Sequence, residues 1–347
     1  MKTRRMKIIE ILPELDIGGV ERHVIDLSNE LTRRGHKILV VSAGGQMQKQ
    51  LSTSVEHRCL PVHKKNPFTG YFCARKISKW VKNDGWQIIH AHSRVPAWIA
   101  MWVSSMANIP FIVTAHADFS TKTHWIYQPY RKAAVAICVS EAVREGMKDC
   151  FCDNTKVITN GLDVPMVRRM KRTEPTARFL FVGRLSRIKG IQDVLAAMPQ
   201  DIDWAFDIVG DGPMADELKE LAQELNISNK VNFHGFSDKT DEYMAQSSCL
   251  LFPSHEEGFG LVLARAAQIG LPFIASNIAS VATMTGTTNG LLQPGDVNMW
   301  HDAIVDFIKT RHAKASIPLE NIPTLAKMVD HIEKIYSGMI KSKGSRK

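Results

Sequence analysis

Short apolar runs alternate along the chain with longer segments in which apolar residues recur every three or four positions. The short runs are typical of buried strands and the longer segments of amphipathic helices, so their alternation predicts parallel α/β sheets. In the first half, a helix over 20–34 is expected to end at Gly35, and Ser140 is expected to cap a helix over 141–149. The strands predicted in this half are 7–12, 37–42, 87–90, 110–114, 135–139 and 156–159.

The alternation is interrupted at 160–175, a polar and basic segment with two prolines, which we interpret as an interdomain linker. It resumes with strands predicted at 178–182, 204–209, 230–233, 249–252 and 272–275. Helical spacing of apolar residues between Ile322 and Lys341 predicts a closing helix. At 347 residues the chain is long for one domain, so we expect two domains and a closing segment, over 1–164, 165–320 and 321–347.

The formal net charge of +9 indicates a basic surface. Basic clusters within 2–7, 168–172 and 341–347 favour an anionic partner, either membrane lipid or a phosphorylated acceptor, although a solvated surface without a partner is equally compatible. Nucleic acid is disfavoured because the aromatic residues, 7% of the chain, are not interleaved with these clusters.

The six cysteines include no Cys-x-x-Cys pair, and several lie inside apolar runs, so we expect buried free thiols in a reducing compartment. The first residues lack the apolar segment of a signal peptide, and the longest apolar stretches are too short to span a bilayer. These features predict a protein that is cytoplasmic or peripheral on the inner face of the cytoplasmic membrane.

Two loops in the second half place charged side chains and glycines directly after predicted strands. The loop that begins at Gly183 contains Arg184 and Lys189, and the one that begins at Ser254 contains Glu257. Ligands of open α/β sheets bind at the carboxyl ends of the strands, so two cations, glycine amides and a helix start predict a phosphate site. A glutamate beside phosphate is explained if it accepts hydrogen bonds from hydroxyl groups, and phosphate with a polyol indicates a nucleotide sugar.

A further turn, Gly210-Asp211-Gly212-Pro213, follows the strand that ends at Val209. It lacks the third glycine of a dinucleotide fingerprint, so NAD binding is disfavoured. In the first half, Gly18 and Gly19 follow the first strand and open a helix, where they can bring backbone amides close to a phosphate. A flexible loop explains that pair equally well.

Histidines gather at strand ends, with His90 and His92 after one strand and His116 after the next. A His-x-His pair could ligate a metal, but no third ligand at suitable spacing completes a set, so we expect no metal and interpret these residues as cleft-lining or core histidines. His116, just past a strand end, is the best candidate for contact with a reacting sugar. Asp201 and Asp203 precede a strand rather than follow one, so they are rejected as a metal–nucleotide site.

In this order along the chain, the motifs resemble those of family 4 of the retaining glycosyltransferases, which have the GT-B fold. The matching motifs are Gly18-Gly19-Val20-Glu21, the region of His116, Val139-Ser140, Asn160-Gly161-Leu162-Asp163, 183–190, 210–213, 231–235 and 257–260. The resemblance covers nearly the whole chain and implies two Rossmann-like, doubly wound parallel-sheet domains facing across a cleft. A softer resemblance, in 91–100 and 110–114, is to transferases of lipopolysaccharide core or other envelope glycans.

The resemblance implies that the C-terminal domain holds a nucleotide-sugar donor, which we expect to be UDP-linked, and that the N-terminal domain holds an envelope glycan or lipid-linked acceptor. Arg184 and Lys189 would hold the diphosphate, Glu257 would accept hydrogen bonds from the donor sugar, and His116 would border the reaction centre. Further donor contacts are expected at Gly18, Gly19, Gly183, Gly210, Gly235, Phe236, Gly258, Phe259, Gly260, Leu261 and Arg265. No metal and no cofactor beyond the donor are expected, because the cations and a helix dipole take the place of a metal.

Arg265 departs from the family pattern, in which a second glutamate stands eight residues after the first and binds the ribose hydroxyls. A guanidinium cannot accept a hydrogen bond from a hydroxyl group. We expect Arg265 to pair with Glu256 or Glu257; the alternative is that it reaches the diphosphate. The departure also leaves open a catalytically weak protein that binds nucleotide sugars.

Overall fold

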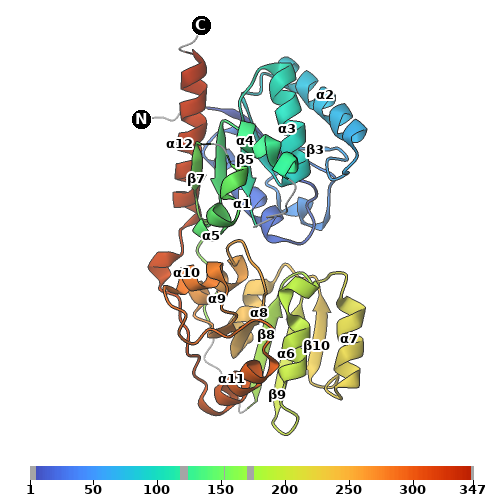
Figure 1. Ribbon diagram of the computed structural model, residues 1–347, viewed down its shortest axis with the longest axis vertical. Helices are drawn as coiled ribbons and strands as arrows, with labels where there is room; N and C mark the ends of the chain where they lie inside the picture. The colour runs from blue at the N-terminus through green and yellow to red at the C-terminus, as the bar shows by residue number, and fades with distance from the viewer. Residues whose placement is uncertain (1–4, 118–123, 152, 170–175, 345–347) are drawn as a thin grey trace. The chain divides into compact units, whose positions relative to one another are not determined.

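The computed structural model describes residues 5–117, 124–151, 153–169 and 176–344. Its internal contacts divide the chain into two compact units. Unit 1 comprises 1–161 and 323–347, and unit 2 comprises 162–322 (Figure 1). The closing helix therefore belongs to the unit formed by the first half of the chain.

Unit 1 is built on a seven-stranded sheet in the order β3-β2-β1-β4-β5-β6-β7, and every pairing in it is parallel. The strands are β1 (Lys7–Ile11), β2 (Lys37–Ser42), β3 (Glu56–Cys59), β4 (Ile88–His92), β5 (Phe111–Ala115), β6 (Val135–Cys138) and β7 (Thr155–Val157). The strand order reverses between β1 and β4, where Ile8 faces Ile38 on one side and Ile88 on the other. Ligands of doubly wound sheets bind at such a reversal.

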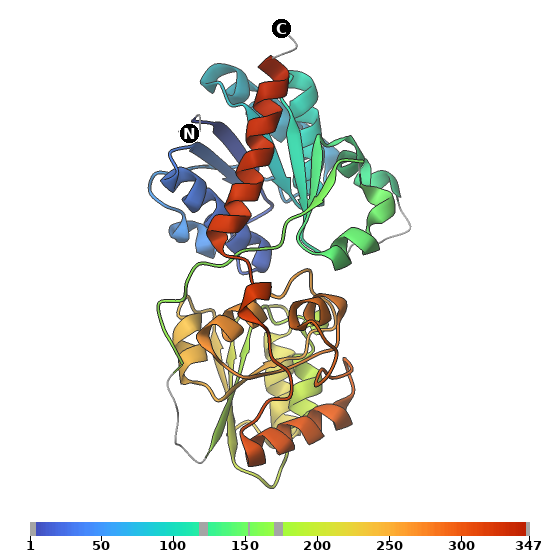
Figure 2. The same ribbon diagram turned by 90° about the vertical axis from the view of Figure 1, so that its left-hand side faces the viewer.

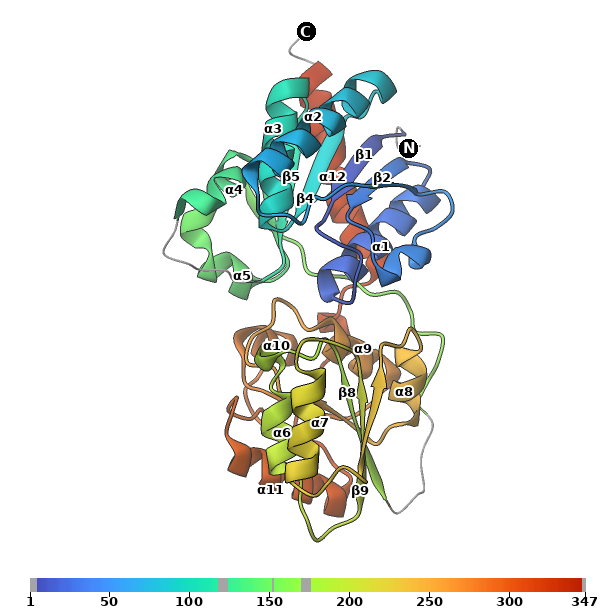
Figure 3. The same cartoon turned by 90° about the vertical axis from the view of Figure 1, so that its right-hand side faces the viewer.

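Helices cover both faces of this sheet. They are α1 (Gly19–Arg33), α2 (Pro67–Asp84), α3 (Arg94–Ala107), α4 (Gln128–Lys132), α5 (Glu141–Gly146) and α12 (Leu325–Gly344). Helix α12 contacts α1 and runs along one face of the sheet (Figure 2), whereas α2 and α3 pack together on the opposite face (Figure 3). The expected ends are confirmed, because Gly35 follows α1 at φ +92° and the Ser140 hydroxyl accepts a hydrogen bond from the amide of Val143 at 3.2 Å.

Ionic contacts fasten α12 to the end of α1. Arg34 donates hydrogen bonds to Asp330 at 2.6 Å and to Glu333 at 2.9 Å. The Nε2 atom of His36 lies 3.0 Å from the other carboxylate oxygen of Glu333. These contacts join residues almost 300 positions apart, so unit 1 is complete only when both ends of the chain are in place.

Unit 2 is built on a five-stranded parallel sheet in the order β10-β9-β8-β11-β12. The strands are β8 (Ala177–Val182), β9 (Trp204–Val209), β10 (Val231–Gly235), β11 (Cys249–Phe252) and β12 (Phe273–Ala275). The helices are α6 (Ile191–Ala197), α7 (Ala215–Glu224), α8 (Thr240–Gln246), α9 (Leu261–Ile269), α10 (Ala279–Thr285) and α11 (Val297–Thr310). The strand order reverses between β8 and β11, which follow the same doubly wound pattern as β1 and β4.

The core of unit 2 is aromatic. Phe179 and Phe206 on neighbouring strands pack with Trp300 and Phe307 of α11, and each of these side chains is at most 1% exposed. Helix α6 lies between α7 and α11 in the same layer (Figure 3). This packing holds β8 and β9 rigidly, so the loops after them start from fixed positions.

Three expectations need correction or comment. Strand β3 was not predicted, because its sequence Glu-His-Arg-Cys is polar and lies at the edge of the sheet. The described cysteines are free thiols and four are buried, but Cys59 is exposed, so the expectation of buried thiols is wrong there. Cys152 lies outside the described residues. Among the described helices, none is both long enough and apolar enough to cross a membrane.

Candidate active site

The three glycine-containing loops predicted from the sequence converge at the carboxyl edge of the unit 2 sheet. They follow β8, β9 and β11, which are neighbours in that sheet. The Gly183 amide donates to the carbonyl of Val209 at 3.0 Å, and the Leu185 amide donates to the carbonyl of Asp211 at 2.9 Å. The Gly210 amide donates to the carbonyl of Gly235 at 2.8 Å, which joins the loop after β10 to the same group. Four predicted donor-binding segments thus share one edge.

Two of these glycines are required by close backbone approach. A Cβ on Gly210 would lie 1.8 Å from the carbonyl oxygen of Gly183, and one on Gly190 would lie 2.1 Å from that of Pro253. Both distances are far below van der Waals contact, and Gly190 also has a φ of +67°, which favours glycine. The loops after β8 and β11 are therefore packed backbone to backbone, and larger residues would force them apart.

Lys189 and Glu257 form the central pair of the site. The Lys189 ammonium donates a hydrogen bond to Oε1 of Glu257, and the Ser254 hydroxyl donates to the same oxygen at 3.1 Å. The side chains are only 23% and 17% exposed, respectively, so water reaches the pair without surrounding it. The His255 amide donates to the carbonyl of Ile188 at 2.8 Å and so links the two loops that carry the pair. The sequence predicted both residues; the structure brings them into direct contact.

Helix α9 begins beside this pair with its amides uncapped. Its N-cap, Gly260, has a φ of +92°, no side chain caps the helix, and no acidic residue lies in its first turn. The first amides of a helix have no partner within it, and together with the helix dipole they attract anions. Gly258 and Phe259 are buried behind this turn, and Leu261 opens the helix.

The other predicted cation, Arg184, is exposed and forms no ion pair with any described residue. Arg187, three residues later, is instead engaged by Glu217 at 2.9 Å. Arg184 can therefore turn toward a ligand without breaking a described ionic contact, which Arg187 cannot.

The expected position of Arg265 is wrong. Its guanidinium donates to the backbone carbonyl of Asp163 at 3.0 Å and also to the carboxylate of that residue, and it donates to Gln268 at 3.2 Å. Asp241 lies 3.6 Å from Arg265 Nε. Arg265 therefore pairs with Asp163 rather than with Glu256 or Glu257. Glu257 already has Lys189 as its partner. Asp163 offers both a carboxylate and a carbonyl to the planar guanidinium.

A polar group beside the predicted donor contacts Gly235 and Phe236 was not found from the sequence. Asp207, in the middle of β9, is 1% exposed, accepts from Arg178, and lies 2.7 Å from Nε2 of His234. Burial opposes ionisation of Asp207, but the hydrogen bonds from Arg178 and His234 outweigh it and lower the pKa of the carboxyl group. This network fixes His234 next to Gly235 and Phe236. The sequence offered one signal for it, because Asp207 is a charged residue inside an apolar strand.

In unit 1 the three predicted histidines belong to a buried polar cluster at the strand reversal. The Nε2 atom of His92 lies 2.8 Å from Glu10, and its Nδ1 atom lies 3.0 Å from Nε2 of His116. Glu10 also accepts from the Tyr336 hydroxyl of α12 at 2.9 Å, and that hydroxyl lies 2.6 Å from Nδ1 of His90. His90 and His92 are therefore core residues, whereas His116 is partly exposed at the rim of the cluster.

Burial keeps these imidazoles neutral. Loss of hydration lowers the pKa of His92 to about 3, and the same cause, with repulsion from His92, lowers the pKa of His23 to about 3. Burial and the neighbouring histidines also hold the pKa of His116 well below its usual value. His116 uses Nε2 toward His92, and its expected contact with a sugar stays a prediction.

The same cluster supplies ligand types that metals prefer. Among the described residues, ligand atoms of His23, His92 and His116, or of Glu10, His90 and His92, lie within 4.8 Å of one another. Sequence spacing did not show a third ligand for the His-x-His pair, but the fold brings one close. In the second group, Glu10, His90 and His92 already contact hydrogen-bond partners within the cluster. That second group is therefore a hydrogen-bonded core.

Gly18 and Gly19 lie between β1 and α1, at the same end of the unit 1 sheet as the cluster. Gly18 is the N-cap of α1, without a side-chain cap, and a Cβ there would lie 2.2 Å from the Glu21 carboxylate. Gly19 is exposed. The Glu21 carboxylate in the first turn of α1 therefore lies next to Gly18, and the phosphate contact expected of these glycines stays a prediction.

Sequence comparisons divide the chain at the same place as the fold. A profile described as Glycosyltransferase Family 4 matches residues 17–165, and one described as Glycosyl transferases group 1 matches residues 168–319. The chain belongs to glycosyltransferase family 4. Members of this family are retaining enzymes that use nucleotide sugars, and this protein is a retaining, nucleotide-sugar-dependent glycosyltransferase.

Characterised relatives of this family 4 glycosyltransferase differ in acceptor. It is 27% identical over 339 residues to the glycogen synthase of Mycobacterium tuberculosis, covering 82% of this chain and 81% of the relative. It is 26% identical over 361 residues to O-antigen chain mannosyltransferase C of Escherichia coli, covering 94% and 96%. The structure of Anabaena HepE in complex with UDP and glucose matches with a TM-score of 0.74 at 20% identity, over 99% of each chain. The two parallel units and such neighbours confirm the GT-B fold class.

Proposed function

We propose that this glycosyltransferase moves a hexose from a UDP-linked sugar to a cell-envelope glycan, such as lipopolysaccharide core or a lipid-linked glycan, on the cytoplasmic side of the membrane and without a metal ion. The observation that carries the proposal is the Lys189–Glu257 pair beside the uncapped start of α9. It offers a cation, a carboxylate and free amides at one sheet edge.

The pair suits a donor that has both a diphosphate and a sugar. When the diphosphate enters, Lys189 can exchange Glu257 for a phosphate oxygen, and the released carboxylate can accept hydrogen bonds from sugar hydroxyls. Negative charge grows on the diphosphate as the glycosyl bond breaks, so Lys189, Arg184 and the α9 amides stabilise the transition state more than the bound donor. These groups supply the charge that a metal supplies in other transferases.

The acceptor assignment is supported by the relatives and by the basic character of the chain. O-antigen chain mannosyltransferase C acts in envelope glycan synthesis by its name, and it aligns with 94% of this chain. The net charge of +9 suits an anionic or membrane-bound acceptor. HepE, crystallised with UDP and glucose, supports the choice of a UDP sugar.

A thermal-shift panel of UDP, GDP and ADP sugars tests the donor. Ligand binding to the folded state raises the melting temperature, and we expect UDP-hexoses to raise it most. Transfer from the preferred donor is then assayed with envelope glycan acceptors. Stabilisation by GDP or ADP sugars alone would refute the base assignment. Stabilisation without transfer to any acceptor would favour the second candidate, a weakly catalytic nucleotide-sugar-binding protein, for which the arginine at position 265 is the specific observation.

A further inference from the structure

One face of α2 is exposed along its whole length and changes from aromatic to basic. Phe68, Tyr71 and Phe72 in its first half are 86%, 50% and 58% exposed. The residues that continue this face toward the end of the helix are Arg75, Lys76, Lys79 and Lys82, all exposed. The opposite face, which packs inward, consists of Gly70, Cys73, Ala74, Ile77, Ser78 and Val81. The aromatic side chains therefore point toward solvent, because the other face of α2 is the one that packs against the protein.

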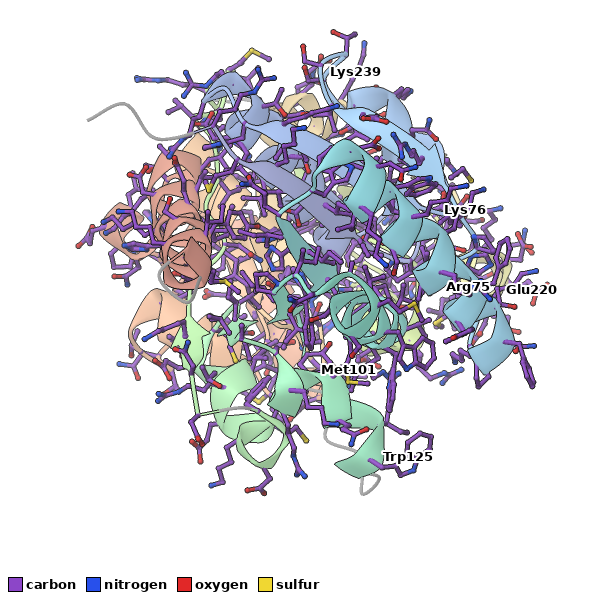
Figure 4. The ribbon with its side chains drawn as sticks, turned by 90° about the horizontal axis from the view of Figure 1, so that it is seen from above. Arg75, Lys76, Met101, Trp125, Glu220 and Lys239 are labelled. Atoms are coloured by element: carbon purple, nitrogen blue, oxygen red, sulfur yellow. The ribbon has the colours of Figure 1, made fainter. Side chains whose placement is uncertain are left out.

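A chain of aromatic rings extends this face across the neighbouring helix. Tyr71 lies 6.2 Å from Trp102 of α3, Trp102 lies 5.8 Å from Trp98, and Trp98 lies 6.3 Å from Trp125, measured between ring centroids. Trp125 is 68% exposed, although the Trp98 indole fixes the backbone beside it by donating to the carbonyl of Ile126 at 3.0 Å. Figure 4 shows Trp125, Arg75 and Lys76 projecting outward from the ribbon.

The segment of the chain that contains these helices is strongly basic. Between residues 57 and 140 the chain has eleven lysines and arginines but only two aspartates and no glutamate, an excess as large as the net charge of +9 of the whole chain. Lys64, Lys65, Arg75 and Lys79 form no ion pair with any described residue. The clusters expected from the sequence at 2–7, 168–172 and 341–347 lie partly outside the described residues.

We propose that this aromatic–basic surface, made of Phe68, Tyr71, Phe72 and Trp125 with Lys64, Lys65, Arg75, Lys76 and Lys79, binds an anionic lipid bilayer. Aromatic residues favour the interface between headgroups and acyl chains, and lysine and arginine are attracted by anionic headgroups. Large exposed aromatic clusters are uncommon on monomeric proteins and mark binding surfaces.

The charge pattern selects a bilayer over a second copy of the chain. A two-fold interface places the same surface on both partners, so two copies meeting here would bring unpaired cations together. An anionic bilayer neutralises all of them at once while the aromatic rings enter its interface. The proposal adds a partner to the proposed function but does not depend on its donor or acceptor, because lipid binding is measured with neither present.

Vesicle flotation tests the proposal. The full chain is mixed with phosphatidylcholine vesicles that contain or lack phosphatidylglycerol. We expect strong binding only with phosphatidylglycerol, and weaker binding at high salt. The triple variant Arg75→Gln/Lys76→Gln/Lys79→Gln should lose roughly 10²-fold in partition coefficient, since each basic residue near an anionic surface contributes about fivefold. The variant Phe68→Ser/Phe72→Ser/Trp125→Ser should lose about tenfold or more, even at low salt.

Matched controls come from unit 2. Leu319 is exposed to 58%, similar to Phe72, and Lys239 is an exposed lysine (Figure 4), so Leu319→Ser/Lys239→Gln should bind vesicles like the unmodified protein. Circular dichroism and the melting temperature, compared with those of the unmodified protein, check that each variant is folded. Failure of the unmodified protein to bind phosphatidylglycerol vesicles, or unchanged binding by both surface variants, would overturn the proposal. So would a dimer in solution that either surface variant abolishes.

Discussion

Lys189 and Glu257 neutralise each other across two loops that follow neighbouring strands, 68 residues apart in sequence. A partly buried ammonium or carboxylate alone would lose much of its hydration, and each offsets that cost for the other. The pair therefore keeps both charges in place before a donor arrives. Binding then exchanges one ionic contact for another instead of creating a charged site from disordered side chains, which keeps the reorganisation of the site small.

Removing the Lys189 ammonium should slow sugar transfer. We expect Lys189→Ala to lower turnover by roughly 10²-fold or more, the scale for losing one preorganised donor to a developing negative charge. Steady-state release of UDP gives the measurement. Arg187→Ala is the control, because Arg187 lies in the same loop but is engaged by Glu217, and its loss should leave turnover nearly unchanged. Near-normal transfer by Lys189→Ala would remove the pair from the mechanism.

Chelation should leave the reaction rate nearly unchanged. The cations and the α9 amides provide the positive charge at the diphosphate, so the proposed mechanism has no step for a metal. The rate is compared before and after dialysis against EDTA. Complete loss of activity that manganese or zinc restores would contradict metal independence and would direct attention to His23, His92 and His116.

Arg265→Glu should restore the carboxylate that is expected to bind the ribose hydroxyls, but the structure indicates that it also destabilises the folded protein. The new glutamate would stand beside Asp163 and Asp241 in place of the guanidinium that now contacts them, so we expect a lower melting temperature for the single variant. The double variant Arg265→Glu/Asp163→Asn removes one of these repulsions. It should bind UDP about tenfold to a hundredfold more tightly than the unmodified protein, as expected for one recovered hydrogen-bonded charge of about 1.5–3 kcal/mol. Calorimetry that shows weaker binding by the double variant would indicate that Arg265 itself assists the diphosphate.

Acidification should destabilise unit 1 through its buried histidines. An unfolded histidine has a pKa of about 6.5, whereas the pKa values of His23 and His92 are about 3 in the folded protein. The unfolded state thus binds more protons, and stability falls as the pH drops from about 6.5 toward 3. At about pH 5.5 each of the two costs roughly 1.4 kcal/mol. The raised pKa of Glu10, caused mainly by burial, acts in the opposite direction.

Urea unfolding at about pH 7.5 and about pH 5.5 measures this loss through the free energy of unfolding. In His23→Leu the free energy of unfolding should depend less on pH, because one buried imidazole is removed. Equal stability of the unmodified protein at both pH values, together with no change in His23→Leu, would contradict a control of stability by these histidines.

The sheets were predictable because buried parallel strands are nearly continuous apolar runs, as in Lys37–Ser42 and Cys249–Phe252. The same rule fails for β3, which is polar and lies at an edge. Helix α2 was not delineated, since its exposed face begins with Phe68, Tyr71 and Phe72 and therefore blurs the apolar periodicity. Apolar residues on an exposed binding surface do not follow the periodicity that predicts a helix from its buried face.

Lys189 and Glu257 of the proposed donor site could be selected from the sequence because each lies in a loop that directly follows a predicted strand. The cluster around His92 could not, because Glu10, His23 and Tyr336 come from β1, α1 and α12 and meet only after folding. A glutamate between Ile9 and Ile11 was a usable signal, since an ionisable residue inside a buried strand requires a partner. The partner of Arg265 was missed because sequence proximity favoured Glu256 and Glu257 over Asp163, which lies 102 positions away.

The attachment of α12 to unit 1 has a consequence for biosynthesis. Domains generally fold in the order in which the ribosome makes them. Here the first half of the chain leaves the ribosome without Tyr336, so the Glu10 carboxyl lacks its hydroxyl donor, and without Glu333, which contacts Arg34 and His36. Unit 2 is translated in full before these residues appear. The nascent first half must therefore wait, with its sheet incompletely covered, while the second half completes its own fold.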